Sequence, residues 1–233
     1  SKMQRIECRL IEMNECAEHI WHVRLAPEQP VTFKPGQYLQ VVMGDKDKRP
    51  FSIASSPTRE AIELQIGATP GNPYPGEVLD QLRQTGSLSV EIPLGKAWLR
   101  EDSSRPILLI AGGTGYSYAR ALLQYLMDTE LNRPVYLYWG VRHESQLYEG
   151  AEVETWSQEY SNLHFMPIVE HPENGWQGRT GMVHEAVLAD FASLDQYDIY
   201  VAGRFEMAAV VRQTLRLRGV QDDHLFGDAY QFI

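Results

Sequence analysis

A strand-to-helix junction near the middle of the chain most constrains what this sequence can fold into. Residues 106–111 form an uninterrupted apolar run, as expected of a parallel strand that is covered on both faces. A glycine-rich turn, Gly112–Gly115, follows directly and leads into a helical pattern over 117–129. Further strands are predicted at 135–139, 163–169 and 198–202, and helices at 145–159, 182–191 and 206–218. This alternation predicts a parallel sheet with helical crossovers.

The first hundred residues follow a different pattern. Short strands with alternating apolar positions are predicted at 5–13, 19–25, 38–43, 51–54, 62–66 and 87–92, with one helix at 77–83. Many short strands separated by Pro and Gly are typical of a small antiparallel barrel. We therefore expect a two-domain β + α/β protein. An antiparallel six-stranded β-barrel over 1–99 would precede a parallel-sheet nucleotide-binding domain over 106–233, with the polar stretch 100–105 as the boundary.

Charge and composition exclude several classes of function. The 21 Lys and Arg against 31 Asp and Glu give a net charge of −10, which disfavours binding to nucleic acid. We expect no membrane contact and a cytoplasmic location, because no apolar run is long enough to span a bilayer and no signal peptide is recognisable. Cys8 and Cys16 are too few for an iron–sulfur cluster and are expected to be reduced thiols, although one disulfide is conceivable. The seven histidines lack metal-ligand spacing, so no metal is expected.

The glycine-rich turn is the first candidate ligand site. Glycines at such a junction let the backbone approach a ligand, and the N-terminus of the following helix offers free N–H groups to an anion. This arrangement suits a diphosphate at the carboxyl edge of the sheet. The G-x-G-x-x-G fingerprint fails at its third glycine, where Tyr118 stands. A tight turn without a ligand therefore remains an alternative for this segment taken alone.

The second candidate is the tetrapeptide Arg49-Pro50-Phe51-Ser52, which taken alone is better explained as the start of a strand with an inward-packed aromatic and an exposed Arg. The wider series is more specific: it runs Gly36-Gln-Tyr38, Arg49–Ser52, Ile66-Gly-Ala68, Gly112–Gly115 and Ala202–Met207. This series resembles the ferredoxin–NADP reductase superfamily over nearly the whole chain. Within it, the sequence is most similar to the bacterial NAD(P)H:flavin oxidoreductases, on the compact length and on the motifs Arg49–Ser52, Gly112–Tyr118, Tyr138-Trp-Gly140, Gly203–Met207 and Phe226–Ala229 with Phe232-Ile233.

The resemblance implies a flavin-binding domain over 1–99. Ser52 would be the catalytic residue, near flavin N5, the atom that accepts hydride, and Arg49 would contact the ribityl chain or the phosphate end. Pro50 and Phe51 would shape the isoalloxazine pocket, Tyr38 would help to wall it, and Gly67 would allow close approach.

The resemblance also implies an NAD(P)H-binding domain over 106–233. Its nucleotide-binding residues would be Gly112, Gly113, Thr114, Gly115, Tyr116, Ser117, Arg204, Phe205 and Glu206. Arg142 could meet a 2′-phosphate or only solvent, so both NADH and NADPH stay open. No metal takes part in the implied chemistry.

Two departures from the superfamily pattern refine the expected function. Relatives that hold FAD tightly commonly carry a Gly-x-x-Ser/Thr turn at the barrel helix, whereas here 67–77 contains several prolines and Glu77. Prolines lack the N–H donor and Glu77 adds a negative charge, so a firm diphosphate clamp is not expected. In addition, Ala202-Gly203-Arg204 replaces Cys-Gly-Pro, which removes the thiol beside the nicotinamide.

We therefore expect an NAD(P)H-dependent flavin reductase that uses riboflavin, FMN or FAD as a weakly bound substrate. Reduced flavin would pass to ferric complexes, a flavin-dependent monooxygenase or a luciferase. One alternative is a reductase with tightly bound FAD that passes electrons to a protein partner. Another is a non-catalytic subunit that keeps the fold.

Overall fold

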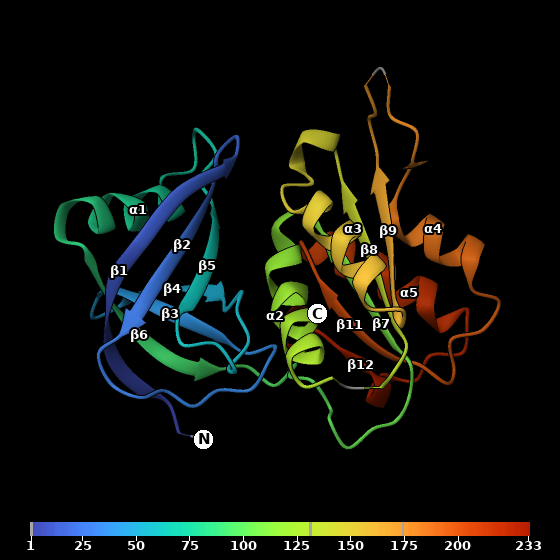
Figure 1. Cartoon of the computed structure of the whole chain (residues 1–233), viewed down its shortest axis with the longest axis horizontal. Helices are drawn as coiled ribbons and strands as arrows, with labels where there is room; N and C mark the ends of the chain where they lie inside the picture. The colour runs from blue at the N-terminus through green and yellow to red at the C-terminus, as the bar shows by residue number, and fades with distance from the viewer. Residues whose placement is uncertain (1, 131, 174) are drawn as a thin grey trace. The chain divides into compact units, whose positions relative to one another are not determined.

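The N-terminal strands form one six-stranded antiparallel sheet (Figure 1). The computed structural model describes residues 2–130, 132–173 and 175–233. The strands are β1 (Gln4–Ala17), β2 (Ile20–Pro27), β3 (Tyr38–Gly44), β4 (Asp47–Ser52), β5 (Ile62–Gly67) and β6 (Ser87–Leu94). They lie in the order β4-β3-β6-β1-β2-β5, and the two end strands, β4 and β5, contact each other. The sheet therefore curves back on itself, which confirms the predicted antiparallel barrel.

The barrel interior is filled by the alternate apolar side chains of its strands. Val23, Leu25 and Leu64 are among those with no exposed surface. Helix α1 (Pro73–Thr85) adds apolar side chains of its own to this core. The helix predicted at 77–83 begins four residues earlier because Asn72 caps it and Pro73 occupies its first position, where a missing N–H has no cost.

Strand β4 is displaced from its predicted position. The strand was expected at 51–54, but it spans Asp47–Ser52 and includes Pro50. Proline is tolerated because β4 is an end strand of the hydrogen-bonded order. Beyond Ser52 the chain leaves β3, since Ser56 and Ala54 bond to side chains of helix α2 instead.

The remaining strands form a six-stranded parallel sheet. They are β7 (Ile107–Gly112), β8 (Val135–Val141), β9 (Leu163–Val169), β10 (Arg179–Thr180), β11 (Asp198–Ala202) and β12 (Leu225–Phe226), in the order β10-β9-β8-β7-β11-β12. The helices are α2 (Tyr116–Asp128), α3 (Gly150–Glu159), α4 (Val183–Asp190) and α5 (Phe205–Arg216). One apolar cluster joins β7, β8 and β11 to α4 and α5. The predicted α/β fold with a parallel sheet is confirmed.

The helix predicted at 145–159 is wrong in its first third. Glu144–Gln146 form a separate 3₁₀ turn, closed by hydrogen bonds between His143 and Gln146, and α3 begins only at Gly150. Leu147 leaves the helical region, with φ −80° and ψ 63°. Gly150 is a weak helix former, so the periodic pattern across this break does not reflect one continuous helix.

The chain divides into two units, one comprising 1–99 with 120–129 and the other 100–119 with 130–233. Compared with the predicted domains, residues 120–129, which include most of α2, group with the barrel instead of the parallel sheet. The polar stretch 100–105 groups with the second unit because Arg133 binds it there: its guanidinium donates to the carbonyl oxygens of Arg100, at 2.9 Å, and Arg105, at 2.7 Å. Asp198, 1% exposed, pairs with Arg133 at 3.0 Å.

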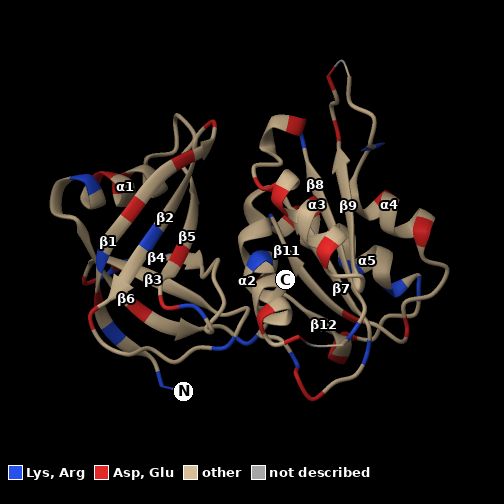
Figure 2. Cartoon of the chain, viewed as in Figure 1, with Lys and Arg blue, Asp and Glu red and all other residues tan. Residues whose placement is uncertain are grey.

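Acidic residues are spread over both units and recur along β1 and α3 (Figure 2). The net charge of −10 is therefore not confined to one segment. Among the residues that the structure describes, no helix is both long enough and apolar enough to cross a membrane. Cys8 is buried and Cys16 exposed on the same strand, and neither forms a disulfide.

Candidate functional site

The paired strands β3 and β4 carry five of the six residues expected to bind flavin. Alternate side chains of a strand point to opposite faces, and directly paired residues share a face. Tyr38 pairs with Ser52, so their side chains lie next to each other. Pro50, two residues before Ser52, shares their face. Gly67 stands apart from this pair in the register, at the end of β5 and opposite Ile20 of β2.

Arg49 and Phe51 point to the other face of β4. They pair with Val41 and Leu39, whose side chains are fully buried in the barrel core. Phe51 packs against that core. The structure therefore places the side chains of the tetrapeptide on two faces of β4, Arg49 and Phe51 on one and Pro50 and Ser52 on the other.

The Arg49 guanidinium donates four hydrogen bonds to neighbouring acceptors. It makes a bidentate pair with Asp47, with Nε to Oδ1 at 2.9 Å and Nη2 to Oδ2 at 2.7 Å. Nη1 donates to Glu77 Oε1 at 2.8 Å and to the Tyr74 carbonyl oxygen at 2.6 Å, and the guanidinium stacks over the Tyr74 ring. The hydrogen bonds to Asp47 and Glu77 raise the pKa of Arg49 above its ordinary value. One cation thus faces two carboxylates at this end of the barrel.

The N-terminus of α1 offers few donors to an anion. Pro73 and Pro75 have no N–H group, and the Tyr74 N–H donates to the Asn72 side chain. Glu77 adds its carboxylate one turn further along. A helix N-terminus usually attracts phosphate because its first N–H groups are free. Here proline and capping remove that property.

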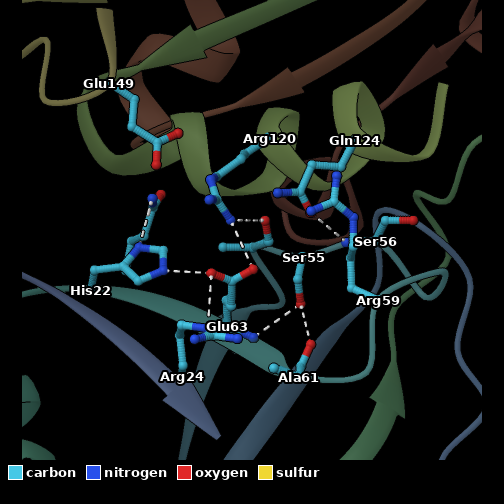
Figure 3. A network of polar contacts seen from close by, with 12 residues as sticks. His22, Arg24, Ser55, Ser56, Arg59, Ala61, Glu63, Arg120, Gln124 and Glu149 are labelled. Carbon is cyan, nitrogen blue, oxygen red and sulfur yellow. Dashed lines mark hydrogen bonds and ion pairs between the residues drawn. The ribbon is translucent and has the colours of Figure 1, made fainter. Parts of the chain in front are cut away.

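A buried polar network, not predicted from the sequence, fixes the chain just beyond Ser52 (Figure 3). Glu63 of β5 accepts a hydrogen bond from His22 at 2.6 Å and pairs with Arg120 of α2 at 3.4 Å. Arg120 also donates to the Ala54 carbonyl oxygen at 3.1 Å. Gln124 accepts from the Ser56 N–H at 3.0 Å. Charged residues in apolar strands and helices were the only sequence signal for this network, and it does not reveal which residues pair.

Glu63 is ionised in this network. Burial opposes its negative charge, but the hydrogen bond from His22 and the charge of Arg120 outweigh burial and lower its pKa to about 2. The carboxylate therefore remains charged across the physiological range and holds Arg120 against the 54–56 segment.

In the second unit, the glycine turn and the segment after β11 pack tightly on one another. Gly112–Gly115 follow β7, and a Cβ at Gly115 would lie 2.3 Å from the Ala202 carbonyl oxygen. A Cβ at Gly203 would lie 2.7 Å from the Met207 sulfur, whose methyl group also lies next to Gly112. The two segments expected to bind the nicotinamide nucleotide are thus brought together. Gly115 is required by backbone packing, whatever its role toward a ligand.

The expected nucleotide-binding residues differ in accessibility. Thr114 is exposed at the turn, whereas Ser117 and Tyr116 are buried in the first turn of α2. The Tyr116 ring is fully buried against Trp139, and the Tyr116 backbone N–H donates to carbonyl oxygens of the turn. Its side chain is therefore placed to support the turn, not to contact a ligand.

Arg204, Phe205 and Glu206 are exposed and, together with Gly203, line a surface hollow of about 370 Å³. Phe205 begins α5 and lies 5.9 Å from the Phe232 ring, centroid to centroid.

Comparisons with known proteins identify the family of this chain. The family model of the oxidoreductase NAD-binding domain matches residues 109–213. An NAD(P)H-flavin reductase of Aliivibrio fischeri is 50% identical over 98% of this chain and 99% of its own length. One of Vibrio harveyi is 46% identical over the same shares.

Solved structures show the same fold. The ferredoxin reductase in carbazole 1,9a-dioxygenase has a TM-score of 0.86 at 25% identity, over 99% of this chain and 70% of its own. An Amycolatopsis cytochrome P450 reductase has a TM-score of 0.88 at 23% identity, over 97% and 69%. The fold and the family match thus define a ferredoxin reductase-like oxidoreductase. The high identity over full length shows that the chain belongs to the NAD(P)H-flavin reductase family, as the sequence motifs predicted.

Proposed function

We propose that this chain transfers hydride from NADH or NADPH to a flavin that binds and leaves as a substrate. The nicotinamide donates the hydride and the flavin ring accepts it, so the protein's part is to bind and orient both. Gly112–Ser117 and Arg204–Glu206 hold the nicotinamide nucleotide, and Tyr38, Pro50, Ser52 and Gly67 line the flavin site. Ser52 places its hydroxyl near the atom that accepts hydride and stabilises the charge that develops there.

The proposal that flavin is held weakly rests on the hydrogen bonds that Arg49 makes within the protein. In a tight FAD site, a free guanidinium and free helix N–H groups would face the diphosphate. Here Asp47 and Glu77 occupy Arg49, and Pro73 and Asn72 leave α1 with few donors. The anionic end of FMN or FAD thus meets no unengaged cation among these residues, and recognition rests on the flavin ring. Riboflavin, FMN and FAD are all accepted, and the reduced flavin passes to ferric complexes, a monooxygenase or a luciferase.

The first test is the visible spectrum of dialysed protein, followed by NADH oxidation with and without added riboflavin. The proposal expects a colourless protein that oxidises NADH only when flavin is supplied. A yellow protein that retains stoichiometric flavin through dialysis would instead indicate a tightly bound FAD and a dedicated protein acceptor.

Replacement of Ser52 by Ala tests the catalytic assignment. We expect kcat to fall about a hundredfold while the KM for NADH stays unchanged, because the hydroxyl acts on the transition state and not on nucleotide binding. Equal loss in both constants, or no loss, would remove Ser52 from this role.

Replacement of Glu77 by Gln tests the reason for weak flavin binding. Removing one carboxylate leaves the positive charge of Arg49 less compensated, so the guanidinium can attract the FMN phosphate. The KM for FMN should therefore fall about fivefold relative to the KM for riboflavin, as expected for one charge pair in a solvated site. Asp80→Asn is the matched control, because Asp80 lies on the same helix and pairs with the exposed Arg83. An unchanged ratio in Glu77→Gln, or the same change in both variants, would contradict the explanation.

A further inference from the structure

Three aromatic side chains gather beneath the glycine turn of the second unit. Trp139 of β8 and Tyr116 of α2 are stacked, with centroids 4.0 Å apart and planes at 11°. Tyr148, in the segment before α3, packs edge-on against both rings, at 5.2 Å from Trp139 and 5.7 Å from Tyr116. Trp139 and Tyr116 have no exposed surface. Such a cluster is rigid because every ring is confined by the other two.

Two hydrogen bonds connect this cluster to its surroundings. The Trp139 indole N–H donates to the Gly113 carbonyl oxygen at 2.9 Å. The Tyr116 hydroxyl donates to Glu149 Oε1 at 2.6 Å. The first bond reaches into the glycine turn itself, and the second fixes the ring on which Trp139 is stacked.

The turn needs such a support. Gly113 has a positive φ of +56°, which glycine adopts at little steric cost. Glycine also loses more backbone freedom on folding than any other residue. A Cβ at Gly113 would meet nothing within 4 Å, so crowding at that position does not impose the positive φ. The bond from Trp139 acts on this residue directly and orients the Gly113–Thr114 peptide.

We propose that Trp139 is a positioning residue for the nicotinamide nucleotide. Its indole N–H holds the Gly113 carbonyl oxygen away from the ligand side and thereby turns the next N–H group toward the nucleotide. The Tyr116 ring and its bond to Glu149 keep the indole in place. The inference rests on the proposed function only in taking Gly112–Ser117 as the nucleotide-binding segment.

Trp139→Phe removes the N–H donor and keeps an aromatic ring in the stack. One lost hydrogen bond should raise the KM for NADH about fivefold and leave kcat and the KM for riboflavin unchanged. Amide hydrogen exchange over 112–117 should become faster. Tyr138→Phe is the matched control: it is the adjacent residue, points to the opposite face of β8, and loses a hydroxyl bond to Asp190 of 2.5 Å.

The control separates positioning from stability. We expect both variants to melt at similarly lower temperatures, whereas only Trp139→Phe should weaken NADH binding and loosen 112–117. The proposal is overturned if Trp139→Phe loses stability without any change in the KM for NADH, or if Tyr138→Phe raises that KM equally.

A second variant and a binding measurement complete the test. If Trp139→Phe does not fold, Tyr116→Phe replaces it. An unchanged KM for NADH in Tyr116→Phe overturns the proposal, and a raised KM for NADH supports it. NADH affinity is also measured by calorimetry without flavin. A wild-type protein that binds NADH but reduces no flavin would refute the proposed function alone, and the calorimetric comparison of the variants would still test Trp139.

Discussion

Replacing Glu63 by Gln removes the carboxylate at the centre of the network in Figure 3 and keeps the shape of the side chain. In the folded protein burial raises the pKa of this group, but the bond from His22 and the charge of Arg120 prevail and lower it from 4.5 to about 2. A lowering of that size corresponds to about 3 kcal/mol of stability at neutral pH. Breaking a buried ion pair by removing one partner costs a similar amount, on the order of 3–5 kcal/mol.

The pH dependence gives the prediction its sign. Because the pKa of Glu63 is lowered on folding, its contribution is complete above pH 4.5 and is lost as the pH falls toward 2. The Gln variant has no such contribution at any pH. The difference in free energy of unfolding between wild type and variant should therefore shrink from about 3 kcal/mol at pH 7 to about 1 kcal/mol at pH 3.

Urea unfolding followed by tryptophan fluorescence, at several pH values, measures this difference. Glu12→Gln is the control: Glu12 pairs with Arg24, at 3.5 Å, but both side chains are about half exposed, so a loss below about 1 kcal/mol is expected. A loss below about 1 kcal/mol in Glu63→Gln at pH 7, or a loss that does not change with pH, would refute the reasoning.

Three other outcomes follow from individual residues. Burial raises the pKa of the Cys8 thiol to about 12, so Ellman's reagent should modify Cys16 alone in the native protein and both cysteines in urea. Rapid modification of both cysteines in the native protein would contradict this expectation. Gly115→Ala should lower the melting temperature and weaken NADH binding, because the new methyl group collides with the Ala202 carbonyl oxygen and lowers the free energy of unfolding by about 1–3 kcal/mol or more. A variant with unchanged melting temperature and NADH affinity would show that the turn is loosely packed. Burial raises the pKa of Asp228 from 3.8 to about 6, so the protonated form that stabilises the folded protein is lost as the pH rises through 6. Asp228→Asn should therefore be more stable than wild type by up to about 3 kcal/mol at pH 8 and equal to it below pH 3.8, as measured by thermal melts across that range; the opposite trend with pH would contradict this expectation.

The elements with long periodic patterns could be predicted from the sequence. The apolar run at 106–111 and the glycine turn after it lie where β7 and the start of α2 lie, because a doubly covered strand has few alternatives. Strands β10 and β12 have two residues each and show no pattern at all. The break before Gly150 was missed for a related reason, since the apolar spacing continues across it.

The grouping of residues 120–129 with the barrel could not be predicted. It rests on contacts between residues far apart in the chain, such as Gln124 with Ser56 and Asp128 with Arg59. Sequence periodicity shows that α2 has a polar side but not which polar groups meet it. The same limit applies to Arg49, whose partner Glu77 lies 28 residues away.

Motifs identify positions, but neighbouring residues decide what those positions do. Arg49 stands in a motif that suggests phosphate contact, yet Asp47 and Glu77 neutralise it and the prolines of α1 remove the accompanying donors. The glycine turn shows the opposite case, because Trp139 and the Ala202 backbone confine it from two sides. Since affinity depends on how far a site is organised before binding, the proposed nucleotide site at the confined turn should bind firmly, whereas the proposed flavin site should leave the anionic end of a flavin without a fixed partner. Under the proposed function, this difference lets the enzyme release its flavin after each transfer.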